Sequence, residues 1–184
     1  VNNSATGVDL SVGGFVGTDT GQIDNSYALG NVAVNDAGTD APIAAGGFAG
    51  RHNGEIDTSF STGSVVVTGA AANIGGFAGL FDGIVSPIIS FDPGLRTTFW
   101  DTETSGLTTS DGGIGLTTAE FQNTDTFLAL GRDAGWDFGT TWAPGDTGFY
   151  PVLYTTSAVV FAEADPLTLV YGTTAGATAT GTTS

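Results

Sequence analysis

The apolar residues in the first half of the chain come in short groups separated by Gly, Asn, Asp and Thr. Such groups, broken by turn-forming residues, are typical of short β-strands joined by tight turns. A Gly-Gly-Phe-x-Gly run begins at Gly13, Gly46 and Gly75, with spacings of 46−13=33 and 75−46=29 residues. Recurrence at this period indicates repeats that stack and bury a common core between neighbours.

The first two copies match well beyond their glycines. The matched positions are Gly21, Ile23, Asp24, Ser26, Tyr27, Gly30, Val32 and Val34, opposite Gly54, Ile56, Asp57, Ser59, Phe60, Gly63, Val65 and Val67. A flexible linker would not hold apolar residues at fixed offsets, so we predict folded repeats of about three strands each.

These repeats predict an all-β fold, a parallel β-solenoid of about three rungs, with a stack of hairpins as the alternative. Phe15, Phe48 and Phe77 are expected to point inward and stack, one in each rung. Proline cannot donate to a central ladder, so Pro87 predicts that the solenoid stops near residue 90. Asn3–Val8 resembles Asn25–Val32, which indicates that the chain starts inside an earlier repeat.

Residues 91–154 differ in character, because all three tryptophans and many other aromatic residues lie there. Thr117 and Glu120 have the spacing of a helix capping box, and Gly131 is placed like a glycine that follows a helix. We therefore expect one or two short helices between Thr118 and Leu130. The aromatic-rich segment is predicted to be a cap over the open end of the solenoid.

The last segment, residues 155–184, contains two β-prone runs, Ala158–Ala162 and Leu167–Tyr171, followed by a tail of Thr, Ala and Gly. The tail cannot build a core of its own, so we expect it to pair with a sheet edge of this chain or of a neighbour. The predicted division is thus 1–90 repeats, 91–154 cap, and 155–184 tail or start of a further β-domain.

The chain is strongly acidic, with 19 acidic and 3 basic residues and a net charge of −16. Nucleic acid and membrane insertion are not expected, because phosphate binding needs basic residues and no apolar run is long enough to span a bilayer. The absence of cysteine excludes disulfides and thiol catalysis. No export leader is recognisable at Val1, so any such signal would lie outside this sequence or have been removed.

The repeats resemble the GLUG-motif repeats of bacterial surface and secreted proteins, including large adhesins of the filamentous-haemagglutinin type. The resemblance lies in the Gly-Gly-Phe-x-Gly openings and in the runs Gly21–Tyr27 and Gly54–Phe60. The segment from Phe99 to Gly106 is similar to the region that often follows such repeats, and the run after Val159 to the opening of small mucin-binding-like β-domains. The resemblance implies an extracellular or cell-surface location and an adhesive role.

Catalysis is not predicted. The only histidine, His52, precedes Asn53-Gly54 and is expected to be an exposed turn residue. Two carboxylate pairs, Asp101 with Glu103 and Asp133 with Asp137, were weighed as glycosidase pairs, but nothing in the sequence marks them as buried. We predict no cofactor and keep calcium as an alternative, because the chain has neither an EF-hand loop nor a nonapeptide repeat.

The aromatic residues offer one candidate binding site. Flat rings beside aspartates can hold a pyranose, so a glycan site was predicted at Trp100, Trp136, Trp142 and Tyr150. The alternative is that these residues fill the core of the cap. A glycan site requires at least two tryptophan rings open in a shared groove.

The function that the sequence favours is a non-catalytic structural or adhesive segment of an exported bacterial protein. It would act as a stiff stalk or filament unit and associate through strand edges with itself or with neighbouring domains. The alternative is a module that binds a carbohydrate or a host receptor.

Overall fold

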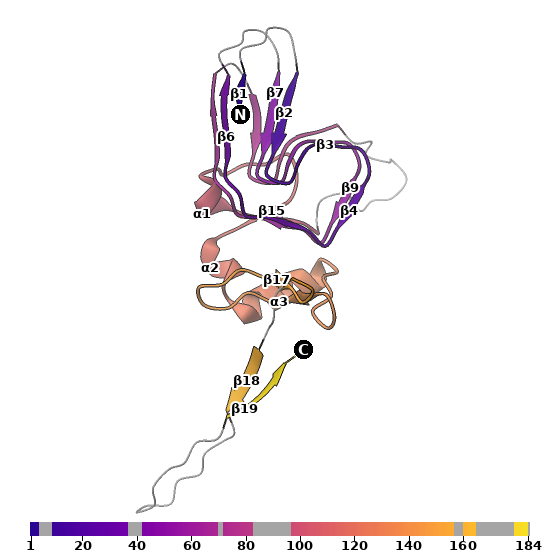
Figure 1. Cartoon of the computed structure of the whole chain (residues 1–184), viewed down its shortest axis with the longest axis vertical. Helices are drawn as coiled ribbons and strands as arrows, with labels where there is room; N and C mark the ends of the chain where they lie inside the picture. Colours follow the sequence, from indigo (N-terminus) through magenta and orange to yellow (C-terminus); the bar gives the residue numbers. More distant parts are fainter. Residues whose placement is uncertain are drawn as a thin grey trace, which may run out of the picture.

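The computed structural model describes residues 1–3, 9–36, 42–69, 72–82, 97–156, 160–164 and 179–183. Within these residues the fold is mostly β-strand, and most of the pairing is parallel, in agreement with an all-β class. Figure 1 shows the stacked strands, a helix-containing part below them and a separate hairpin. Pro87 and the run 167–171 lie outside the described residues.

Each full repeat forms five short strands rather than the three that were expected. Layer 1 (residues 10–36) contains β2 (Leu10–Gly13), β3 (Val16–Asp19), β4 (Gln22–Asp24), β5 (Tyr27–Ala28) and β6 (Val32–Asp36). Layer 2 (residues 43–68) contains β7 (Ile43–Gly46), β8 (Ala49–His52), β9 (Glu55–Asp57), β10 (Phe60–Ser61) and β11 (Val65–Thr68). One of the extra bends is at Asn25 and Thr58, which have positive φ angles of 48° and 42°.

Layer 3 consists of residues 72–81 and 97–101. It contains β12 (Ala72–Gly75), β13 (Ala78–Phe81) and β14 (Phe99–Asp101). β14 lies inside the segment predicted as a cap, yet it pairs with β10 as the third strand of the row that starts at β5. The repeat pattern therefore contributes strands on both sides of residue 90.

Equivalent strands of successive layers pair in parallel, which places equivalent residues side by side. Gly13 lies opposite Gly46, which lies opposite Gly75. Tyr27 lies opposite Phe60, which lies opposite Phe99. The alignment of the first two copies is confirmed, and the spacings of 33 and 29 residues are the registers of the sheets.

A further short strand, β1 (Asn2–Asn3), pairs with β6 on the side opposite β11. Asn2 lies opposite Asn35, so residues 1–3 correspond to the end of a layer, as expected. The proposed match of Asn3 with Asn25 is wrong, because the sheet register is 35−2=33 residues rather than 22.

The three repeat phenylalanines stack across the layers. The ring centroids of Phe15 and Phe48 are 4.7 Å apart, and those of Phe48 and Phe77 are 4.8 Å apart. Phe48 and Phe77 are buried, but Phe15 is 50 % exposed, because no described residue covers the outer face of its ring. The inward position predicted for Phe15 is therefore only half met.

The glycine before each phenylalanine is required by close contact between layers. A Cβ atom at Gly46 would lie 2.1 Å from the Ala49 carbonyl oxygen and 2.6 Å from that of Phe77. Both obstacles are backbone, so no side-chain movement could relieve them. The recurring glycine is thus a condition for stacking.

Layer 3 is covered on its outer side by residues 107–116, which we call the covering segment. It ends in β15 (Ile114–Leu116), which pairs in parallel with β14. Ser110 Oγ accepts hydrogen bonds from the backbone N–H groups of Phe77 and Ala78, each at 3.0 Å. Leu107 packs against the apolar clusters that run through the layers.

Residues 117–156, called the aromatic unit, contain most of the remaining regular structure. Its elements are α2 (Thr118–Phe121), α3 (Thr124–Asp133), β16 (Trp142–Ala143) and β17 (Val152–Leu153), and a short helix α1 (Thr102–Ser105) precedes it. The predicted capping box at Thr117 and Glu120 is confirmed. The predicted end of the helix at Gly131 is wrong, because α3 continues to Asp133 and Gly131 packs closely against Phe138.

The aromatic unit does not close the end of the stack. It packs against one side, where its core includes Phe60 of layer 2 and Phe99 of layer 3, with Tyr27 of layer 1 at the margin. In Figure 1 the unit lies below the stacked strands, along the row that contains β15. The cap prediction is corrected in this respect: the covering segment lies over layer 3, and the aromatic unit spans all three layers.

The described part of the last segment is a two-stranded antiparallel hairpin of β18 (Val160–Ala164) and β19 (Ala179–Thr183). β19 belongs to the Thr/Ala/Gly tail, so this part of the tail pairs with a strand of its own chain. None of the described helices has the length and apolarity needed to cross a membrane.

Candidate functional site

The four residues predicted to bind a glycan are divided between two apolar clusters. Trp100 belongs to the core of the layers and lies against Gly76, where a Cβ atom would approach its ring to 1.9 Å. Trp136 and Trp142 belong to the core of the aromatic unit, and Tyr150 packs beside them. The structure therefore does not bring the four side chains together in one site.

The tryptophan rings are also closed to solvent. Trp100, Trp136 and Trp142 are at most 4 % exposed, and the centroids of the last two lie 4.6 Å apart. The shared open groove required by the glycan prediction is not formed by these rings. The cause is the side-on packing, because the rings fill the space between the aromatic unit and the layers.

Both indole N–H groups of the aromatic unit bind the layers. Trp142 Nε1 donates to Asn25 Oδ1 at 3.1 Å, and Trp136 Nε1 donates to the Thr97 carbonyl oxygen at 2.7 Å. Asn25 Oδ1 also accepts from Thr58 Oγ1, so the side chains of neighbouring layers are linked at this contact. The polar ends of the rings thus serve to attach the aromatic unit.

Asp101 is the polar centre of the attachment. It is fully buried, and its Oδ1 caps α1 by accepting from the N–H groups of Glu103 and Thr104. Its Oδ2 accepts from Thr118 Oγ1 and from the Tyr150 hydroxyl, each at 2.7 Å. Burial, with the hydrogen bond to Asp101, raises the pKa of Tyr150 to about 12.

This saturation bears on the carboxylate pair Asp101 and Glu103. A glycosidase needs one carboxyl group free to give a proton and another free to attack or to activate water. Both oxygens of Asp101 are occupied, and exposed Glu103 accepts from the Thr118 N–H at 2.9 Å. The pair therefore connects α1 to α2, and no catalytic arrangement is seen there.

Asp137, from the second pair, is exposed and organises a turn. It accepts from the N–H groups of Gly139 and Thr140 and from the Thr140 and Thr141 hydroxyls. These bonds, led by the one from the Thr140 hydroxyl, lower the pKa of Asp137. Among the described residues no group of three or more His, Asp or Glu side chains could hold a metal ion.

His52 differs most from its predicted position. It is in β8, it is fully buried, and it stacks on Phe81 with ring centroids 5.3 Å apart. Its Nδ1 lies 3.0 Å from Asp19 Oδ2, whereas Nε2 has no hydrogen-bond partner in the described structure. Burial lowers the pKa of His52, and the contact with Asp19 opposes that shift only in part.

The His52–Asp19 pair could have been found from the repeat spacing. The two residues are 52−19=33 positions apart and face each other in the register of β3 and β8. The short sequence Asn53-Gly54 indicated a turn and drew attention away from that register. No hydroxyl contacts Nε2 in the described residues, so the pair lacks the nucleophile of a serine hydrolase.

Comparison of the sequence with protein-family models, with curated proteins and with solved structures finds no match.

Proposed function

We propose that this chain is a non-catalytic structural segment of an exported bacterial surface protein, in which a parallel β-solenoid of about three rungs forms part of a stiff stalk. The observation that carries the proposal is the in-register row of Phe15, Phe48 and Phe77, with centroid spacings of 4.7 and 4.8 Å. Rows of this kind transmit rigidity, because each layer is fixed by hydrogen bonds and by packing to the next.

The aromatic unit supports the same role as a lateral brace. It binds layer 1 through Asn25 and layer 3 through Thr97, so bending of the layers against one another would break both contacts. It also covers the face of the β5–β10–β14 row with a continuous apolar core. The wider adhesive setting and the extracellular location rest on the resemblance to GLUG-motif repeats.

The stack has different ends, which favours a stalk over an end-to-end filament. The covering segment lies over layer 3, whereas layer 1 presents strand edges. Association through edges is therefore assigned to layer 1.

Stiffness can be tested with spin labels, because the chain has no cysteine and labels can be placed at will. Thr18 and Leu80 both lie opposite Arg51, on its two sides. The variant with Thr18→Cys and Leu80→Cys should give one narrow distance of about 10 Å between backbones, two strand spacings. A broad distribution in the folded chain would contradict the stalk, and the urea-unfolded chain is the control.

A further inference from the structure

The two ends of the stack differ at the same backbone positions. The carbonyl oxygen of Phe48 accepts from the N–H groups of Phe15 and Val16, and that of Phe77 accepts from Phe48 and Ala49. At layer 3 the acceptor for Phe77 and Ala78 is the side-chain oxygen of Ser110. One hydroxyl thus replaces the carbonyl that a fourth layer would supply.

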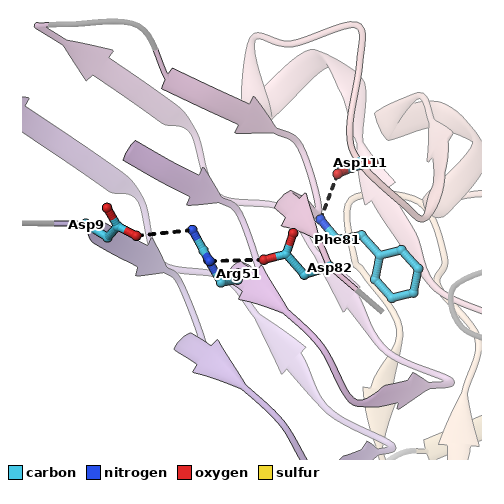
Figure 2. A network of polar contacts seen from close by, with 5 residues as sticks. All are labelled: Asp9, Arg51, Phe81, Asp82 and Asp111. Carbon is cyan, nitrogen blue, oxygen red and sulfur yellow. Dashed lines mark hydrogen bonds and ion pairs between the residues drawn. The ribbon is translucent and has the colours of Figure 1, made fainter. Parts of the chain in front are cut away.

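The covering segment occupies other positions of a fourth layer as well. The Thr109 carbonyl accepts from Gly76 N–H at 3.1 Å, and Asp111 Oδ2 accepts from Phe81 N–H at 2.7 Å. Figure 2 shows Asp111 at this edge, beside the ion pairs that Arg51 of layer 2 makes with Asp9 and Asp82. Growth of the stack beyond layer 3 is therefore blocked.

Layer 1 has groups of the same kind without partners. The N–H groups of Asn53 and Thr62 in layer 2 donate to carbonyls of layer 1, at 2.9 and 3.0 Å. Their equivalents in layer 1, Thr20 and Leu29, have no acceptor among the described residues. The Phe15 carbonyl oxygen likewise has no described donor, and one face of its ring is open.

One row on this side is already continued. β1 pairs with β6 in the register of the repeats, and Asn35 N–H donates to the Val1 carbonyl oxygen at 2.9 Å. This contact shows which kind of segment the edge accepts: a parallel strand displaced by one repeat. The same surface is used twice inside the chain, between layers 1 and 2 and between layers 2 and 3.

We propose that the open edge of layer 1 is a docking surface for one further layer of the same repeat, running in the same direction, and that the stack extends only at this end. The proposal rests on the stacked architecture of the proposed function. The occupant must supply a Gly-Gly-Phe-x-Gly run, because a Cβ atom at Gly14 would already lie 2.2 Å from the Gly47 carbonyl oxygen.

The test is a full-length chain in which residues 10–42 are duplicated directly before Leu10, so that the added copy can form the further layer. Hydrogen exchange measured by NMR should slow by at least roughly 100-fold at the amides of Thr20 and Leu29. The amides of Phe15 and Val16, which already donate to Phe48, should be protected with or without the extension.

A matched control carries Gly14→Val in the added copy only. Its new side chain would meet the backbone of the original Gly14, so the protection of Thr20 and Leu29 should be lost while that of Phe15 and Val16 stays. Unchanged exchange at Thr20 and Leu29 in the duplicated chain would overturn the proposal. Unprotected Phe15 and Val16 in the original chain would instead show that the proposed stack itself is wrong.

Sedimentation of the unmodified chain over a range of concentrations tests the competing occupant. The proposal expects no concentration-dependent protection of Thr20 and Leu29. If these amides became protected as a dimer formed, the surface would belong to a second copy of the chain, and the proposal of a further layer would fail.

Discussion

The layers and the aromatic unit build their cores in opposite ways. In the layers each buried row repeats one residue type, so Phe48 meets Phe15 and Phe77 in nearly parallel stacks with interplanar angles of 8° and 11°. In the aromatic unit the rings meet at many angles, from 23° between Trp136 and Phe138 to 90° between Trp136 and Phe127. The first core is set by backbone register and the second by side-chain shape.

This difference predicts different sensitivities. A core set by register depends on glycines that let backbones approach, whereas a core of interlocking rings depends on the volume of each ring. The two cores meet at Phe60, which is on β10 and contacts the rings of Tyr27, Phe121, Trp142 and Tyr150. Substitutions can therefore separate the two kinds of order.

The largest effect is expected from Gly46→Ala in the layers. The added methyl group would overlap two backbone oxygens, so the layers must separate locally, and the loss should exceed about 4 kcal/mol or unfold the chain. Gly30→Ala is the matched control, because nothing lies within 4 Å of the position of its Cβ. Urea unfolding followed by circular dichroism checks both, and equal stabilities would show that register does not depend on this glycine.

Phe60→Ala should have the next largest effect, about 3–5 kcal/mol, because it removes a fully buried ring shared by both cores. The near-ultraviolet circular dichroism of the tryptophans should collapse in the same transition as the sheet signal. Phe149→Ala is the control, since that ring is 73 % exposed, and its change should stay within about 0.5 kcal/mol. Two separate transitions in the parent chain would show that the regions fold independently.

The same contrast explains what could be predicted from sequence. The rows of Gly13, Tyr27 and Val32 with their equivalents followed from spacing alone, because register in a stack is periodic. The capping box at Thr117 was also local. The placement of the aromatic unit was not, because nothing in Trp136 or Trp142 says whether a ring covers the end or the side of a stack. Its partners, Asn25 and Thr97, are remote in the chain.

The buried state of Asp101 was missed for the same reason, since its four donors come from α1, α2 and Tyr150. Asp101→Ala would remove a helix cap and leave two hydroxyls without their acceptor, at a cost of about 2–3 kcal/mol. Asp101→Asn should recover part of this loss, because its amide oxygen can still cap α1.

An alkaline titration of tyrosinate absorbance sharpens that prediction. In Asp101→Asn the pKa of Tyr150 should fall from about 12 but stay above the value of free tyrosine, since burial is the larger cause of its shift. An unchanged pKa would mean that the carboxylate does not contribute.

The smallest expected effect concerns His52, which links the periodic core to a titratable group. Burial lowers its pKa below the ordinary value of 6.5, so between that value and the folded-state pKa the unfolded chain binds more protons. Stability should therefore fall as the pH drops below 6.5, by at most about 1.4 kcal/mol per pH unit for one proton. Urea midpoints measured from about pH 7.5 to about pH 5 give the slope.

The control is His52→Gln, which keeps a polar side chain beside Asp19 but cannot titrate, so its profile should be flatter over this range. If the parent chain instead became more stable on acidification, the folded-state pKa would be raised. The contact with Asp19 would then act as an ion pair that outweighs burial, and the row of β3 and β8 would hold a charge where the geometry indicates a neutral ring.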